Sequence, residues 1–178
     1  MTRVFVSSDL HLFHRNIIKY CPESRLFTSI EEMHAKIIDN WNEAISPLDL
    51  VYILGDITFG KEHESAAILD KLNGLKVLIL GNHDKHLMKS ELLKSKFVEI
   101  HDYLEIKHGK HDVVLFHYEQ KEWNGIHHGS FALYGHSHST RIGPGRSMDI
   151  GLDSNMCNPW LLDDVIAILE PKKPLQHH

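Results

Sequence analysis

The chain has 178 residues, of which 42% are hydrophobic and 24% are charged, and its formal net charge is −5 at pH 7. This composition is that of one globular domain with a buried core, and it excludes a disordered tail, a collagen and a coiled coil. The acidic balance also argues against an extended nucleic-acid surface, which usually lies on a basic domain. The negative net charge is still compatible with short or small phosphorylated ligands.

The chain lacks the marks of a membrane or exported protein. No stretch approaches the ~20 uninterrupted apolar residues of a membrane helix, and the N-terminus leads directly into a strand pattern. Cys21 and Cys157 lie far apart without a CxxC partner, which indicates free thiols in a reducing compartment. We therefore expect a soluble, cytoplasmic protein. Residues 1–174 form the expected domain, and 175–178 a tail in which His177 and His178 resemble the remnant of an expression tag.

Short apolar segments alternate with amphipathic ones through the first half of the chain. This pattern predicts strand–helix–strand units, a largely parallel sheet and the α/β fold class. The first strand is expected at 4–7, and the clearest helix after Ser29, where Glu32 completes a capping box. The other elements expected in this half are strands at 50–54 and 77–80 and helices at 64–72 and 87–94.

The second half is richer in strand patterns. A hairpin turn is expected at 108–110, and a short helix within 159–169 ends the fold. Trp160 and Leu161, in this last segment, either close the core or form a homodimer interface, and the sequence leaves both open. The strands expected in this half are 97–100, 103–107, 113–116, 131–134 and 148–150.

Polar residues follow the expected strands at their C-terminal ends, where ligands bind in open α/β sheets. Histidine is frequent, at 16 residues, and several of these histidines stand at such ends. The glycines before three of the clusters permit tight turns. The candidate ligands are Asp9, His11, Asp56, Asn82, His117, His136 and His138.

These seven residues offer carboxylate, amide and imidazole donors and no thiolate. Seven ligands exceed the need of one tetrahedral zinc ion, and the mixed oxygen and nitrogen donors suit manganese, iron, zinc, nickel or cobalt. Two divalent ions that share one ligand are the simpler interpretation. Such a pair is the usual arrangement for in-line attack on phosphorus, and manganese is the ion we expect first.

The same residues resemble the signature of the calcineurin-like metallophosphoesterases. The blocks are Asp9-x-His11, Gly55-Asp56, Gly81-Asn82-His83-Asp84, His117 and Gly135-His136-x-His138, in the order of that family. They span most of the chain. The segment 8–18 also resembles a small, uncapped bacterial and phage branch of the family. The resemblance implies a single-domain, four-layer α/β/β/α sandwich.

The resemblance also implies a role for each matching residue. Asp9, His11 and His138 would hold one ion, Asp56 would bridge, and Asn82, His117 and His136 would hold the other. A hydroxide that bridges the metals would attack the phosphorus. His83 would donate a proton to the leaving group, with Asp84 behind it to orient the ring. One departure is that Leu12-Phe13-His14 stands where many relatives have an early glycine.

Several further residues are candidates for the pocket. His14 and Asn16 follow the first cluster and either contact substrate or only cap a helix. Arg141 follows the last cluster, where a guanidinium could bind a phosphate. Weaker candidates for the border of the pocket are Tyr118, Glu119, Trp123, His127 and His128.

The expected function is a metal-dependent phosphoesterase that hydrolyses a phosphodiester or a phosphomonoester. The chain has no room for a cap domain, which favours a small or flexible substrate and no membrane partner. One alternative is a nuclease or cyclic-nucleotide phosphodiesterase, although no basic stripe supports it. Another is a non-catalytic, protein-binding scaffold of the same fold. The scaffold predicts eroded ligands, yet none of the signature residues is missing.

Overall fold

The computed structural model describes residues 2–175, so that His177 and His178 lie outside the described residues. The strands are β1 (Val4–Ser7), β2 (Leu50–Ile53), β3 (Leu75–Ile79), β4 (Glu99–His101), β5 (Leu104–His108), β6 (His111–Leu115), β7 (Phe131–Tyr134), β8 (Ser147–Asp149) and β9 (Trp160–Leu161). The α-helices are α1 (Ile17–Tyr20), α2 (Ile30–Ala44), α3 (Glu62–Leu69), α4 (Glu91–Lys94) and α5 (Leu162–Leu169). Three 3-10 helices are η1 (Leu87–Lys89), η2 (Ile126–His128) and η3 (Leu152–Ser154).

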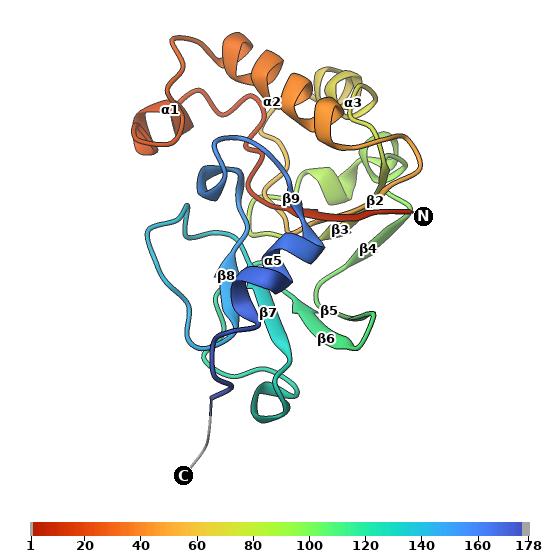
Figure 1. Cartoon of the computed structure of the whole chain (residues 1–178). Helices are drawn as coiled ribbons and strands as arrows, with labels where there is room; N and C mark the ends of the chain where they lie inside the picture. The colour runs from red at the N-terminus through yellow and green to blue at the C-terminus, as the bar shows by residue number, and fades with distance from the viewer. Residues whose placement is uncertain (1, 176–178) are drawn as a thin grey trace.

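The strands form two sheets that pack face to face (Figure 1). In the first sheet the order is β4-β3-β2-β1-β9, with β1 to β4 parallel and β9 antiparallel to β1. In the second the order is β5-β6-β7-β8, where only the β5–β6 hairpin is antiparallel. The expected α/β class and the largely parallel sheet are confirmed.

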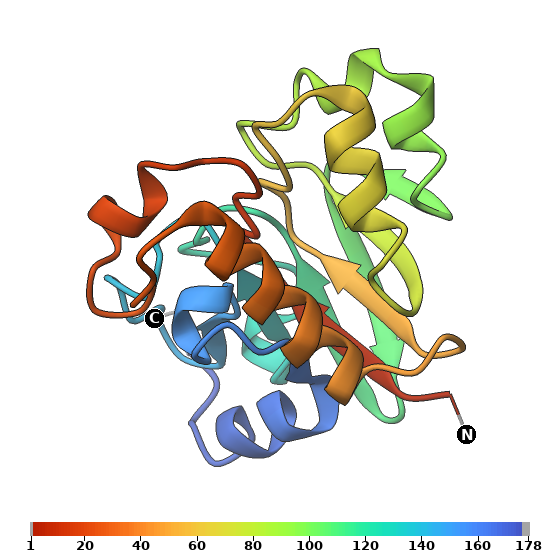
Figure 2. The ribbon, with the colours of Figure 1, turned by 90° about the horizontal axis from the view of Figure 1, so that it is seen from above.

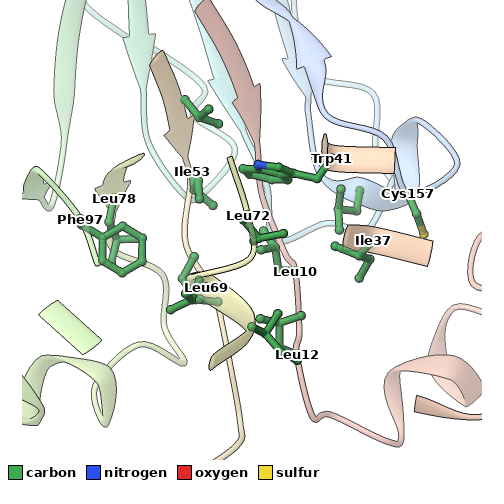
Figure 3. Packing of buried hydrophobic residues seen from close by; sticks show 14 of the residues in the cluster. Leu10, Leu12, Ile37, Trp41, Ile53, Leu69, Leu72, Leu78, Phe97 and Cys157 are labelled. Carbon is green, nitrogen blue, oxygen red and sulfur yellow. The ribbon is translucent and has the colours of Figure 1, made fainter. Parts of the chain in front are cut away.

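Helices α2 and α3 cover the outer face of the first sheet, as Figures 1 and 2 show. Ser29 caps α2, as the sequence predicts, because its hydroxyl accepts a hydrogen bond from the Glu32 amide. The apolar stripe of α2 then packs Ile37 and Trp41 against the sheet, and Figure 3 shows both beside Leu10. Leu10 and Leu12, on the chain that leaves β1, are buried in the same core.

A second core lies between the two sheets. Val6 and Val77 of the first sheet meet Leu115 and Phe131 of the second, and α5 packs its apolar face into the same cluster beside β1, β8 and β9. The outer face of the second sheet has a thinner cover, in which Trp123 and other residues around η2 pack on β6 and β7. The fourth layer of the sandwich is therefore formed by a loop and one 3-10 turn.

Apart from shifted bounds and short helices such as α1 that were not predicted, the structure differs from the predicted elements mainly at two places. The helix expected at 87–94 is divided at Ser90, whose hydroxyl accepts from the Leu93 amide and starts α4 anew. The segment expected as one terminal helix first pairs with β1 as β9, so that Trp160 and Leu161 pack against the two cores of the chain itself. Leu175, at the end of the described residues, packs against the cluster around Trp123. None of the described helices is long and apolar enough to cross a membrane.

Candidate metal centre

The candidate ligands lie together where the C-terminal ends of both sheets meet. Asp9, Asp56 and Asn82 follow β1, β2 and β3, while His117 and His136 follow β6 and β7. Backbone hydrogen bonds align these ends, from the Asp9 amide to the Gly55 carbonyl and from the Gly135 amide to the His117 carbonyl. The parallel topology thus gathers distant segments at one edge.

A first ligand group consists of Asp9, His11 and His138, whose donor atoms lie within 4.8 Å of one another. Asp9 Oδ1 is 3.5 Å from His11 Nε2 and 3.9 Å from His138 Nε2. Asp9 Oδ1 and His11 Nε2 are also buried without a hydrogen-bond partner. Buried polar atoms normally have a partner, so this pair fits a cation that binds between them.

A second ligand group consists of Asp56, His117 and His136, again within 4.8 Å of one another. Asn82 joins it, since its Oδ1 is 3.0 Å from His117 Nε2. Asp56 Oδ2 lies 3.6 Å from His117 Nε2 and 3.7 Å from His11 Nε2. This single carboxylate oxygen therefore faces both groups, which is the position that a bridging ligand needs.

The protonation states of several of these groups suit a divalent ion, which needs deprotonated ligands. His138 is the exception, because burial is outweighed by the hydrogen bond to Asp153 and the nearby carboxylates, which raise its pKa. Burial lowers the pKa of His11 and His136, so both imidazoles are neutral at neutral pH. Burial opposes ionisation of Asp9, but the nearby imidazoles of His11 and His138 lower its pKa overall. The nearby Cys21 is different, because burial and the charge of Asp153 raise the pKa of its thiol to about 11.

The backbone at the ligands adopts the left-handed region. The residues with positive φ include five of the seven candidate ligands: Asp9 (58°), His11 (49°), Asp56 (55°), His136 (64°) and His138 (46°). Two glycines make room for these turns, since a Cβ at Gly81 would collide with Asp56 Oδ1 and one at Gly135 with Asp9 Oδ2. The close approach of the loops therefore requires glycine at 81 and 135.

A buried ion pair that the sequence analysis missed supports the first group. Arg25 and Asp153 have fully buried side chains, joined by Nε–Oδ1 and Nη2–Oδ2 hydrogen bonds of 2.9 Å. Arg25 also donates to the carbonyls of Asp9 and Leu10, and Asp153 Oδ2 is 2.7 Å from Nδ1 of His138. Asp153 follows β8, so the strand-end pattern could have indicated it, whereas Arg25 stands in a loop without any pattern.

The expected role of Asp84 is corrected by its contacts. Its carboxylate accepts hydrogen bonds from the backbone amides of Asp56, Ile57 and Gly81, at 2.8–3.0 Å. All of these bonds hold the turns around Asp56, and none reaches the His83 ring. Asp84 therefore fixes the backbone of the second group instead of orienting His83.

His83 stands at the edge of the ligand groups with its side chain 46% exposed. Its amide donates to Asp56 Oδ1, its Nε2 lies 3.9 Å from Asp56 Oδ2, and its ring packs against Phe59 at 4.9 Å between centroids. It lines a cleft of about 1380 Å³ together with His11, His136 and His138. A group in this position can reach a ligand bound over Asp56.

The cleft contains some of the predicted pocket residues but not others. His14, Tyr118, Glu119 and Arg141 line it, and Arg141 lies 3.9 Å from the Glu119 carboxylate. Asn16 is not among the residues that line it and is the N-cap residue of α1, the other role that the sequence allowed, so a substrate contact there stays a prediction. Trp123 is buried under the second sheet, and His127 and His128 belong to η2 on that same remote side.

A second cavity of about 620 Å³ lies beside the first. Asn82, Met88, Phe116 and Tyr118 are among the residues that line it, and Tyr118 lines both cavities. Both cavities thus border the ligand groups.

Comparison with known proteins finds relatives along most of the chain. The uncharacterized protein MJ1445 of Methanocaldococcus jannaschii is 30% identical over 182 residues, which cover 97% of this chain and 94% of that protein. The Gene 66 protein of Mycobacterium phage L5 is 30% identical over 170 residues, with 80% of each chain covered. The chain belongs to the family of these proteins. No family model matches it.

A solved structure shares the fold of this family member. AQ665, a protein of unknown function from Aquifex aeolicus, is 27% identical and superposes with a TM-score of 0.76 over 94% of this chain and 100% of that chain. The phosphoesterase YfcE from E. coli is 17% identical, with a TM-score of 0.45 over 84% of this chain and 78% of that chain. The latter likeness is too weak to carry an argument about function.

Proposed function

We propose that the protein is a phosphoesterase that depends on two divalent metal ions, with manganese as the first ion to try. The observation that carries this proposal is the position of Asp56 Oδ2, 3.7 Å from His11 Nε2 and 3.6 Å from His117 Nε2, between two groups of nitrogen and oxygen donors. The unpartnered Asp9 Oδ1 and His11 Nε2 support it. One ion would be held by Asp9, His11 and His138, and the other by Asn82, His117 and His136. Asp56 would bind both ions.

The chain's own groups would divide the work of hydrolysis. Two divalent ions, when bound, supply an activated water molecule and neutralise charge on the phosphate oxygens. His83 stands beside Asp56 at the open cleft and would hold a proton for the departing oxygen. Arg141, on the wall of the same cleft, would bind a phosphate oxygen of the substrate.

The cavities favour a phosphodiester with small or flexible substituents. A diester carries two substituents on phosphorus, and the two cavities that share Tyr118 offer each of them a place. A monoester would leave one cavity without a function in substrate binding. The cleft lining also includes Glu23 and Glu119 beside Arg141, so it has no row of cations for a nucleic-acid backbone.

The test compares hydrolysis of bis-p-nitrophenyl phosphate and p-nitrophenyl phosphate by metal-stripped protein with Mn²⁺ added back. We expect the diester to be cleaved faster. His83→Ala should keep its metal and lose about 100-fold or more in turnover, the usual effect of removing a general acid. Asp56→Ala should lose metal and turnover together, because it removes the shared ligand.

The matched control is His128→Ala, which removes an exposed histidine of η2, remote from the ligand groups. It should keep both metal and turnover. Equal metal content and equal rates in His83→Ala and Asp56→Ala would contradict the site assignment. Failure of the metal-loaded protein to cleave either ester would favour the scaffold alternative.

A further inference from the structure

The His11 ring offers its two nitrogens to different environments. Its Nε2 is buried, has no hydrogen-bond partner, and faces Asp9 Oδ1 at 3.5 Å and Asp56 Oδ2 at 3.7 Å. Its Nδ1 lies 3.1 Å from Nδ1 of His14. The Nε2 separations are too long for good hydrogen bonds, whereas the Nδ1 separation is within the normal range.

Two ring nitrogens at this separation require one proton between them. A histidine that binds a cation through Nε2 must offer the lone pair of that atom, so a neutral His11 carries its proton on Nδ1. The hydrogen bond then runs from His11 Nδ1–H to the lone pair of His14 Nδ1. His14, in turn, carries its own proton on Nε2.

We propose that His14 is a positioning residue of the metal centre, which holds His11 in the Nδ1–H tautomer and so leaves Nε2 free for a divalent ion. The proposal rests on the proposed function only in that Asp9, His11 and His138 bind such an ion. It assigns His14 a partner inside the protein, His11, in place of the direct substrate contact considered from the sequence.

Two other ligand histidines follow the same rule with different partners. His138 Nδ1 lies 2.7 Å from Asp153 Oδ2, and His117 Nδ1 lies 2.6 Å from the Leu54 carbonyl. Carboxylates and backbone carbonyls are the usual partners of the second nitrogen in metal-binding histidines. His11 has neither, and the imidazole of His14 takes their place.

The position of the His14 ring is fixed by its surroundings. The ring stacks on Phe59 at 4.2 Å between centroids and at an interplanar angle of 22°, and Tyr20 meets it edge-on at 5.9 Å. Its backbone amide donates to the His11 carbonyl at 3.1 Å, which keeps the two residues in one turn. Phe59 also stacks on His11 at 5.3 Å, so the same aromatic ring aligns both imidazoles.

The first measurement reads the tautomers in the metal-free protein by two-bond ¹H–¹⁵N NMR of the imidazoles. We expect His11 as the Nδ1–H form and His14 as the Nε2–H form. In His14→Leu, which has no acceptor, His11 should shift toward the Nε2–H form. In His14→Asn, where an amide oxygen lies near the former Nδ1 position, it should keep the Nδ1–H form.

The second measurement is Zn²⁺ affinity by competition with a chelator, with His128→Leu as the matched control. For the more tightly bound of the two Zn²⁺ ions, the affinity of His14→Leu should be 10–100-fold weaker than that of the native protein, as is typical when the partner of a ligand histidine is lost. His14→Asn should recover most of that loss, and His128→Leu should lose nothing. A merely structural role of His14 would not let the asparagine restore affinity where leucine does not.

A native His11 in the Nε2–H form, or unchanged Zn²⁺ affinity in His14→Leu, would overturn the proposal. If His14→Leu does not fold, the native spectrum alone decides. If the native protein binds no divalent ion, the proposed function fails. The tautomer spectrum still shows in that case whether His14 accepts the His11 proton, so the two failures are distinguishable.

Discussion

The two ligand groups face the same Asp56 carboxylate, yet the chain supports them by different means. Behind the first group, the buried Arg25–Asp153 ion pair holds the Asp9 carbonyl and the His138 ring. Behind the second, Asp84 binds backbone amides, and the outermost ligand, His136, is exposed. The first group is thus fixed by side-chain charges that are costly to separate, and the second by backbone hydrogen bonds.

The largest effect is expected where the buried ion pair is broken. Arg25→Met should lower the free energy of unfolding of the metal-free protein by about 3–5 kcal/mol, because Asp153 keeps a buried charge without its partner. Urea unfolding measures this change. The control is Arg15→Met, since Arg15 is exposed and has only a 3.5 Å contact with Glu31. Similar unfolding midpoints for the two variants would show that the buried ion pair does not stabilise the first ligand group as described.

A smaller effect is expected in the support of the second group. Asp84→Asn replaces one acceptor oxygen with an amide NH₂, so at least one of the three amides of Asp56, Ile57 and Gly81 loses its acceptor. The free energy of unfolding should fall by about 2 kcal/mol, the usual cost of an unsatisfied buried donor. The exposed Asp39→Asn on α2 is the control in the same urea series. A loss as large as that of Arg25→Met would remove the distinction between the two supports.

The smallest effect concerns pH, at a histidine beside the first group. His34 Nε2 accepts from the Phe13 amide at 2.9 Å, and burial lowers the His34 pKa. The unfolded chain therefore takes up the proton first, so stability is complete above the unfolded pKa of about 6.5 and is lost as the pH falls from there through the folded pKa.

The measurement is urea unfolding between pH 7.5 and 5 in a chelator. The native protein should lose more stability than His34→Gln over this range, because the glutamine oxygen accepts from Phe13 but does not titrate. Parallel profiles for the two proteins would show that His34 does not contribute to the acid sensitivity.

The position of the ligands followed from the sequence because parallel strands bring their C-terminal ends to one edge. Asp9, Asp56 and Asn82 each come directly after an apolar strand, and the structure brings them together with His117 and His136. Metal binding by these residues stays a prediction, as does proton donation by His83. The start of α2 after Ser29 is also predictable from the sequence, since the capping box depends on two residues only three positions apart.

The supports of the site depend on contacts between distant segments, which a periodic pattern does not reveal. Arg25 and Asp153 are 128 positions apart, and neither lies in a repeating pattern. β9 is only two residues long, so its pairing with β1 leaves little trace in the sequence. The prediction for Asp84 was wrong because its sequence neighbour, His83, is not the group that its carboxylate contacts.

The left-handed backbone at Asp9, His11, Asp56, His136 and His138 has a consequence for the evolution of the fold. An L-residue in this region costs about 1 kcal/mol relative to glycine. Glycine at any of these positions would relax the turn and remove a donor atom. At Asp9 and Asp56 the same change would also remove the acceptors of the His136 and His83 amides, so the relief of main-chain strain is offset by lost hydrogen bonds. Strain in the main chain and hydrogen bonding by the side chain therefore oppose each other at these positions, which limits the substitutions that a descendant could accept.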